Sequence, residues 1–252
     1  MMAGHRGRLR QAEAFSRTVL ALLGLALAVP DHTTLSRRAG AFAGRQLRVA
    51  QHDGSVHLVL DSTGLQLFGQ GEWDAQKHGR TRRHWRKPPI AVDADGGGIA
   101  GHGLTRDNTD DAAARAPDFL RTVEGSVVNV TASGACDGNA VHRAAIWQQG
   151  PPPDVVIPPR PCAVPSTDDP AARTPRDRPI RLVAEQGRMA QQRAGGYGRR
   201  THVQTAIGRY KHLIGPKLRA RALPGQQCEA TLAVTVLNHT IRTAKPVPMR
   251  KT

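Results

Sequence analysis

The chain has 252 residues, which is enough for one sizeable domain or for one domain with a helical appendage. Its 36 lysines and arginines outweigh 20 aspartates and glutamates, and the resulting net charge of +16 favours a polyanion partner such as nucleic acid over a merely solvated basic surface. The three cysteines are odd in number and form no C-x-x-C pair, which argues against a disulfide framework or a zinc site and favours a reducing, cytoplasmic compartment.

The N-terminal part of the chain is predicted to be helical. Residues 9–29 read as one helix, and the helical spacing of Leu20, Leu23 and Leu27 predicts that it is buried. The apolar stretch 18–29 also mimics the core of a signal peptide, so export is the alternative. After Pro30, either Asp31 or Thr33 is expected to cap a short basic helix that ends near Arg38.

Strand patterns begin after residue 55. The segment His57-Leu58-Val59-Leu60 is a strand candidate that ends in Asp61-Ser-Thr-Gly. A second candidate, 90–93, leads into a glycine-rich turn at 95–98, and residues 99–104 would form the return strand. These three strands are predicted to make an antiparallel meander.

Helices and strands then alternate. We expect a helix over 110–123, a strand over 127–131, a helix over 139–149 and a short strand over 154–157. The segment 151–179 is rich in proline and is predicted to be an irregular loop or a mobile, exposed linker. Helices follow over 181–192, 199–213 and 226–242. This order predicts an α/β protein with a ribonuclease H-like mixed sheet flanked by helices, with a helical segment at 1–50 and a domain at 51–252.

Two parts of the sequence contain candidate functional residues. Asp61 stands where a buried strand ends, and side chains there project into the crevice beside a sheet, although an aspartate before a turn is more often turn chemistry. Residues 197–211 form a predicted helix on which Arg200, Gln204 and Lys211 follow the spacing i, i+4, i+11. Eleven residues make about three turns, so the three side chains are predicted to share one face.

Several motifs resemble those of bacterial insertion-sequence transposases of the DDE class, in the same order along the chain. They are PDHTTLSRR (30–38), LVLDSTGLQLFG (58–69), IAVDADGGGIAGHGLT (90–105), DNTDDA (107–112), VTASGACDG (130–138) and YGRRTHVQTAIGRYK (197–211). The last one resembles the Tyr-x2-Arg-x3-Glu-x6-Lys signature of that class. By this resemblance the chain looks N-terminally shortened, and residues 1–50 would be the remnant of a DNA-binding region.

The resemblance implies a catalytic centre that differs at two positions. The class uses three carboxylates to hold two Mg²⁺ or Mn²⁺ ions for strand cleavage and transfer. Asp61 corresponds to the first carboxylate, and it is the one metal ligand kept. Ser133 and Gln204 stand at the second and third positions, and both are neutral. We therefore predict a centre without catalytic activity, in which metal binding is doubtful; Asp137 is the one nearby acid that could replace the second carboxylate.

The resemblance also implies DNA contacts. Tyr197, Arg200 and Lys211 are expected to hold phosphates, and Arg82, Arg83 and Trp85 form a second candidate DNA-binding group, with core packing as the alternative for the tryptophan. The implied partners are double-stranded DNA at the terminal inverted repeats of the element and a second copy of the chain, at the bacterial nucleoid. The alternative functions are a non-catalytic DNA-binding regulator and a decayed pseudogene product.

One further departure concerns the second strand. Pro88 and Pro89 precede Ile90, where relatives carry apolar residues. Because a proline cannot donate to a sheet, either the strand begins late or the sheet is locally damaged.

Overall fold

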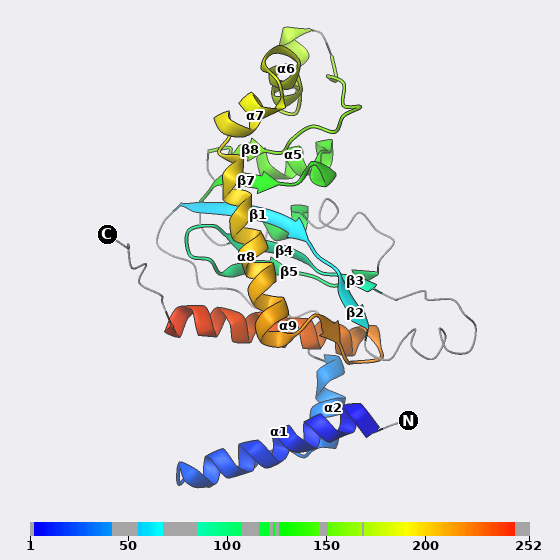
Figure 1. Cartoon of the computed structure of the whole chain (residues 1–252), viewed down its shortest axis with the longest axis vertical. Coiled ribbons are helices and arrows are strands. Elements are labelled where there is room, and N and C mark those ends of the chain that lie inside the picture. The colour runs from blue at the N-terminus through cyan, green and yellow to red at the C-terminus, as the bar shows by residue number, and fades with distance from the viewer. Residues whose placement is uncertain are drawn as a thin grey trace, which may run out of the picture.

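The computed structural model describes residues 3–41, 55–67, 85–106, 116–120, 123, 126–146, 151–167 and 169–244 (Figure 1). Its centre is a mixed five-stranded sheet in the order β5-β4-β1-β7-β8. The strands are β1 (Val56–Ser62), β4 (Pro89–Asp93), β5 (Ile99–His102), β7 (Val127–Ala132) and β8 (Asp154–Val156). The strand β1 pairs antiparallel with β4 and parallel with β7, and β8 continues parallel to β7.

Both faces of this sheet are covered by helices. Leu58 and Leu60 of β1 pack on one face with Phe119 from the helical residues 116–120 and with Val141 of α5 (Asn139–Ile146). Val59 points to the other face, which is covered by α8 (Thr201–Arg209) and α9 (Leu223–Thr243), as Figure 1 shows. Alternate residues of one strand thus serve two cores. The prediction of a mixed sheet flanked by helices is confirmed.

A second, small sheet was not predicted. It has the order β6-β3-β2-β9 and consists of β2 (Leu65–Leu67), β3 (Trp85–Lys87), β6 (Thr105–Arg106) and β9 (Lys217–Leu218). These strands have two or three residues each, which is too short for a period-two pattern to stand out. The pair of prolines lies where the chain passes from β3 in this sheet to β4 in the large one.

The prolines do not damage the large sheet. Pro89 is the first residue of β4 and pairs with Ser62, and its carbonyl oxygen accepts a hydrogen bond from the Gly103 N–H at 3.0 Å. The first position of a strand tolerates proline because an acceptor is kept while the missing donor costs little there. The strand thus begins at Pro89, one residue before the late start at Ile90, and the alternative of a damaged sheet is wrong.

The prediction of a buried helix over 9–29 was wrong. The helix α1 (Ala3–Leu22) ends where Gly24 takes a positive φ of 68°, and the N–H groups of Gly24 and Leu25 return to the carbonyls of Ala21 and Leu20 at 3.1 and 2.9 Å. This is a Schellman motif, which stops a helix. Leu23 and Leu27 beyond it are 64% and 65% exposed. No helix among the described residues is long and apolar enough to cross a membrane.

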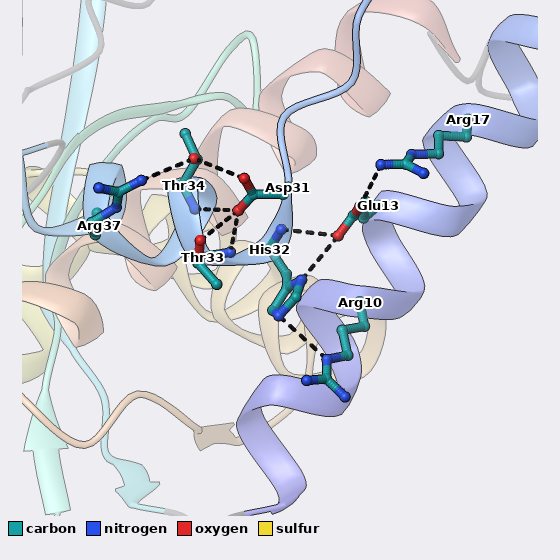
Figure 2. A network of polar contacts seen from close by, with 8 residues as sticks. All are labelled: Arg10, Glu13, Arg17, Asp31, His32, Thr33, Thr34 and Arg37. Carbon is teal, nitrogen blue, oxygen red and sulfur yellow. Dashed lines mark hydrogen bonds and ion pairs between the residues drawn. The ribbon is translucent and has the colours of Figure 1, made fainter.

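The turn between α1 and α2 (His32–Ala41) is held by two carboxylates (Figure 2). Asp31 caps α2, because its carboxylate accepts the N–H groups of Thr33 and Thr34, each at 2.8 Å. Glu13 of α1 accepts from the backbone N–H of His32 at 2.9 Å and lies 3.0 Å from the Nδ1 atom of its ring. Hydrogen bonding to His32 is the main reason that the pKa of Glu13 is lowered. The predicted basic helix and its Asp31 cap are confirmed.

The proline-rich segment is irregular but firmly attached. Its residues Pro153, Ile157 and Pro158 are buried, and β8 lies within it as predicted. At its far end the carboxylate of Asp177 accepts from the backbone N–H groups of Ser166 and Thr174, each at 2.7 Å. The prediction of an exposed linker was therefore wrong for the first half of the segment, where Pro153 and Pro158 pack against the domain.

The remaining helices differ from their predicted bounds by a few residues. The expected helix over 181–192 is divided into α6 (Asp177–Gln186) and α7 (Arg188–Ala194) at Gly187, whose φ is 85°. The start of the expected helix 110–123 and the end of the expected helix 139–149 lie outside the described residues.

Candidate functional site

Asp61 lies at the end of the central strand, as predicted. It is the next to last residue of β1 and pairs with Ile90 of β4, and its side chain is 14% exposed. One carboxylate oxygen, Oδ1, accepts the N–H of Ser62 at 2.9 Å. The other, Oδ2, accepts from Nη2 of Arg200 at 2.8 Å. Both oxygens of the first candidate metal ligand are therefore already engaged by this chain.

Arg200 reaches Asp61 from a short 3₁₀ turn, Tyr197–Arg200 (η3), that packs over the ends of β1 and β7. Its guanidinium carbon lies 6.0 Å from the centre of the Tyr197 ring. Burial disfavours the charged guanidinium, but the charge of Asp61 and the neighbouring Tyr197 outweigh burial and raise the pKa of Arg200. The Arg200 side chain remains 29% exposed, so part of it is open to solvent.

Ser133 lies directly beyond the end of β7, and it precedes a 3₁₀ turn, Gly134–Cys136 (η1). Cys136, the last residue of this turn, is fully buried. Burial raises the pKa of the Cys136 thiol to about 11; a hydrogen bond with Ser133 acts in the opposite direction, and the charge of Asp61 adds to the rise. Ser133, Cys136, Asp61 and Arg200 thus form one cluster at the ends of the two central strands. We name these four residues the strand-end cluster.

Gln204 and Lys211 are not part of this cluster in the described contacts. Gln204 is exposed on α8, whereas its neighbours Val203 and Ala206 are buried against the sheet. Lys211 lies in a π-helical turn, Tyr210–Ile214 (η4). Within the described part of the chain, neither side chain makes a hydrogen bond or an ion pair.

The prediction of one regular helix over 199–213 was wrong. The segment is a 3₁₀ turn, an α-helix and a π-helical turn in succession. A 3₁₀ turn has about 3.0 residues, and a π turn is wider than an α turn, so the predicted i, i+4, i+11 face is not a property of one regular helix. The buried ring of Tyr210 marks the point at which the helix widens.

The strand-end cluster does not fit two divalent cations. The structure shows no group of three or more histidine, cysteine, aspartate or glutamate side chains that could hold a metal within the residues it describes. Asp61 is the one acidic side chain among the four residues of the cluster, and its Oδ2 atom is already paired with the positively charged guanidinium of Arg200. A Mg²⁺ ion in a protein usually binds one or two carboxylates besides water, so two such ions need more negative charge than Asp61 supplies, and Ser133 and Gln204 add none.

Asp137 does not replace the missing second carboxylate. Its side chain is 1% exposed, and its two oxygens accept from Nε and Nη2 of Arg176 at 2.7 and 2.8 Å. Oδ2 also accepts the backbone N–H of Arg160 at 3.0 Å. The aspartate therefore fastens the proline-rich segment to the sheet.

Of the second candidate DNA-binding group, Arg82, Arg83 and Trp85, the structure describes the tryptophan. Trp85 is the first residue of β3 and is 36% exposed, and its ring lies so close to Gly64 that a Cβ atom there would come within 2.9 Å of Cε3. The ring is thus packed on one side and open on the other. Arg82 and Arg83 lie outside the described residues.

Sequence reasoning missed the pairing of Asp61 with Arg200. It assigned the two residues to separate tasks, metal binding and phosphate binding, whereas the structure brings them into one ion pair across 139 positions of sequence. The signal was the loss of charge at Ser133 and Gln204, since a strand-end aspartate without metal ions needs another cation.

Comparison with known proteins supports the resemblance stated above. Residues 6–70 match the family model of the transposase DDE domain. The matched segment includes Asp61 and ends before Ser133 and Gln204, so the assignment of these two positions rests on the motifs alone.

Among the solved structures that are similar to the chain is a cryo-EM structure of the piggyBac transposase synaptic complex with hairpin DNA. The similarity covers 75% of this chain and 47% of that chain, with 9% sequence identity and a TM-score of 0.45. A likeness at this level carries no weight in the assignment, which depends on the family model and the order of the motifs. The chain is thus similar to the transposase DDE domain over residues 6–70.

Proposed function

We propose that this protein binds DNA as a member of the transposase class but does not carry out metal-dependent cleavage and transfer of DNA strands. The observation that supports the proposal is the ion pair between Asp61 and Arg200, at 2.8 Å, in a cluster whose other candidate metal ligand is a serine. The guanidinium engages a carboxylate oxygen that a metal ion would otherwise use as a ligand.

The loss of charge is large on the scale of catalysis. Two unit charges about 4 Å apart interact by about 4 kcal/mol at an effective dielectric of 20, and a divalent ion interacts more strongly. Losing about 4 kcal/mol of transition-state stabilisation slows a reaction about a thousandfold. Two of the three carboxylates of the class are absent, so the expected rate of metal-dependent cleavage is negligible.

DNA binding does not require those carboxylates. The net charge of +16 provides long-range attraction to a phosphate backbone. Arg200 and the half-buried Tyr197 lie together at the ends of the central strands, where a backbone phosphate could approach. The affinity should fall steeply with salt, because each neutralised phosphate releases about one counterion.

The first experiment tests cleavage. Purified protein is incubated with Mg²⁺ or Mn²⁺ and a supercoiled plasmid that carries the inverted repeats flanking the gene. We expect no strand cleavage by the unmodified protein, whereas the double variant Ser133→Asp, Gln204→Glu should recover metal-dependent cleavage. The triple variant that adds Asp61→Ala to these two changes is the matched control and should stay inactive.

The outcomes separate the two parts of the proposal. Cleavage by the unmodified protein would overturn the claim that its centre is inactive. A double variant that melts cooperatively and still fails to cleave would show that Ser133 and Gln204 are not the defect. A chain that shows no cooperative thermal transition at all would instead support the alternative of a decayed product.

A further inference from the structure

The Arg200 guanidinium is only partly used by its neighbours. Its Nη2 donates to Asp61, and Tyr197 also contributes to its environment. Its Nε is buried and has no hydrogen-bond partner within the described part of the chain. A guanidinium carries five N–H donors in a rigid fork that matches the oxygens of a phosphate. Leaving this Nε donor unpaired costs free energy, and the side chain is 29% exposed, so an incoming acceptor can reach part of it.

Asp61 is in turn held by the backbone. The Ser62 N–H bonds to its Oδ1 atom, and the residue belongs to the central strand, which is paired on both sides. Its carboxylate is thus a rigid point, and the guanidinium that it binds is restrained in direction. A pre-oriented side chain loses less conformational entropy when a ligand binds.

We propose that Asp61 is a positioning residue for Arg200, and that the oriented guanidinium binds one phosphodiester oxyanion of the DNA backbone beside the strand-end cluster. The inference rests on the proposed function, since it concerns the same DNA. It assigns to Asp61 a task that is independent of metal ions.

A simple electrostatic view predicts the opposite effect of Asp61. A carboxylate near a DNA phosphate repels it, so removing the carboxylate should strengthen binding when metal ions are absent. If Asp61 instead orients Arg200, removing it should weaken binding although the protein becomes more positive. The sign of the change therefore distinguishes a positioning residue from a leftover metal ligand.

The experiment measures DNA affinity by fluorescence anisotropy with a short labelled duplex in EDTA over a series of NaCl concentrations. We expect Asp61→Ala to weaken binding about tenfold, the effect of one charge-assisted hydrogen bond. Asp154→Ala, which removes the exposed carboxylate at the start of β8, is the matched control and should leave affinity unchanged or slightly higher. Arg200→Lys should bind as weakly as Asp61→Ala, since an ammonium lacks the fork.

The salt series adds a readout that a loss of stability would not change. The slope of log affinity against log salt should fall by about one phosphate contact in Asp61→Ala and equally in Arg200→Ala. The double variant should lose no more than Arg200→Ala alone, because the two residues act as one unit. Asp61→Asn keeps the size of the side chain and replaces Asp61→Ala in these measurements if the alanine variant does not melt cooperatively.

Two results would overturn the inference. Tighter binding by Asp61→Ala than by the unmodified protein would show that the carboxylate repels the DNA. An unchanged salt slope in both Asp61 variants would show that Arg200 does not depend on Asp61. Absence of DNA binding by the folded, unmodified protein would be a different result, because it would refute the proposed function itself.

Discussion

The buried ion pair of Asp137 with Arg176 provides the strongest test of how this fold is held together. Asp137→Asn keeps the shape of the side chain but removes its charge and turns one acceptor into a donor. Arg176, whose side chain is 17% exposed, would keep its charge and face an amide instead of a carboxylate. The N–H of Arg160 would compete with it for the one remaining oxygen.

The expected cost is large for a single substitution. Removing one partner of a buried pair typically destabilises a protein by about 3–5 kcal/mol, since an uncompensated charge stays in the interior. We take the lower end, about 3 kcal/mol, because Arg176 is partly exposed. With a urea dependence of about 3 kcal/mol per molar for a chain of this size, the unfolding midpoint should fall by about 1 M.

The assay is urea unfolding followed by circular dichroism at pH 7, with Asp154→Asn as the control for an exposed carboxylate on β8. Burial opposes the charged form of Asp137, but hydrogen bonds from Arg176 and Arg160 outweigh it and lower its pKa. A lowered folded pKa means that the stabilisation is fully present above about pH 4 and is lost as the pH falls through the folded value. Equal midpoints for Asp137→Asn and Asp154→Asn would refute the reasoning.

Two further predictions concern stability. Burial lowers the pKa of His102 to about 4, and its Nε2 lies 3.0 Å from the Thr231 hydroxyl, so unfolding takes up a proton below about pH 6.5. Protonation of His102 should therefore decrease the free energy of unfolding by about 3 kcal/mol between pH 7 and pH 4. When the denaturation midpoint is plotted against pH, His102→Gln should flatten the curve between these two values. An equally steep curve for His102→Gln would contradict the role given to His102. A Cβ atom on Gly195 would lie 2.5 Å from Cγ1 of Val156, so Gly195→Ala should cost about 1–3 kcal/mol in urea unfolding, whereas Gly198→Ala, with no atom within 4 Å, should be close to neutral.

The large sheet was predictable because its strands carry strong patterns. Residues 58–60 of β1 are apolar in succession, as expected of a central strand covered on both sides, and the turn after β4 is marked by Asp93 and three glycines. The Asp31 cap was predictable for the same reason, since it depends on neighbours in sequence. Local chemistry of this kind leaves a signature within a few residues.

The features that sequence analysis missed depend on distant partners or on subtle geometry. The end of α1 at Leu22 follows from the left-handed conformation of Gly24, which an apolar helical pattern concealed. The helix widens at Tyr210, whose ring is buried in the core on the face of the sheet covered by α8 and α9. Gln226 of α9 accepts from Arg86 of β3 at 2.9 Å across 140 positions, and no spacing rule could have joined them.

The strand-end cluster shows why the proposed loss of carboxylates would leave the fold intact. A carboxylate at position 133 would repel Asp61, so a neutral serine there removes repulsion and costs no core contact. Ser133 is half-buried and Gln204 is exposed, and neither fills the apolar interior. Asp61 is different, because its removal would leave Arg200 as a partly buried cation beside the end of β1. Asp61 therefore compensates the charge of Arg200 even where no metal ion binds. This ion pair places Asp61 beside the DNA-binding surface proposed for the chain.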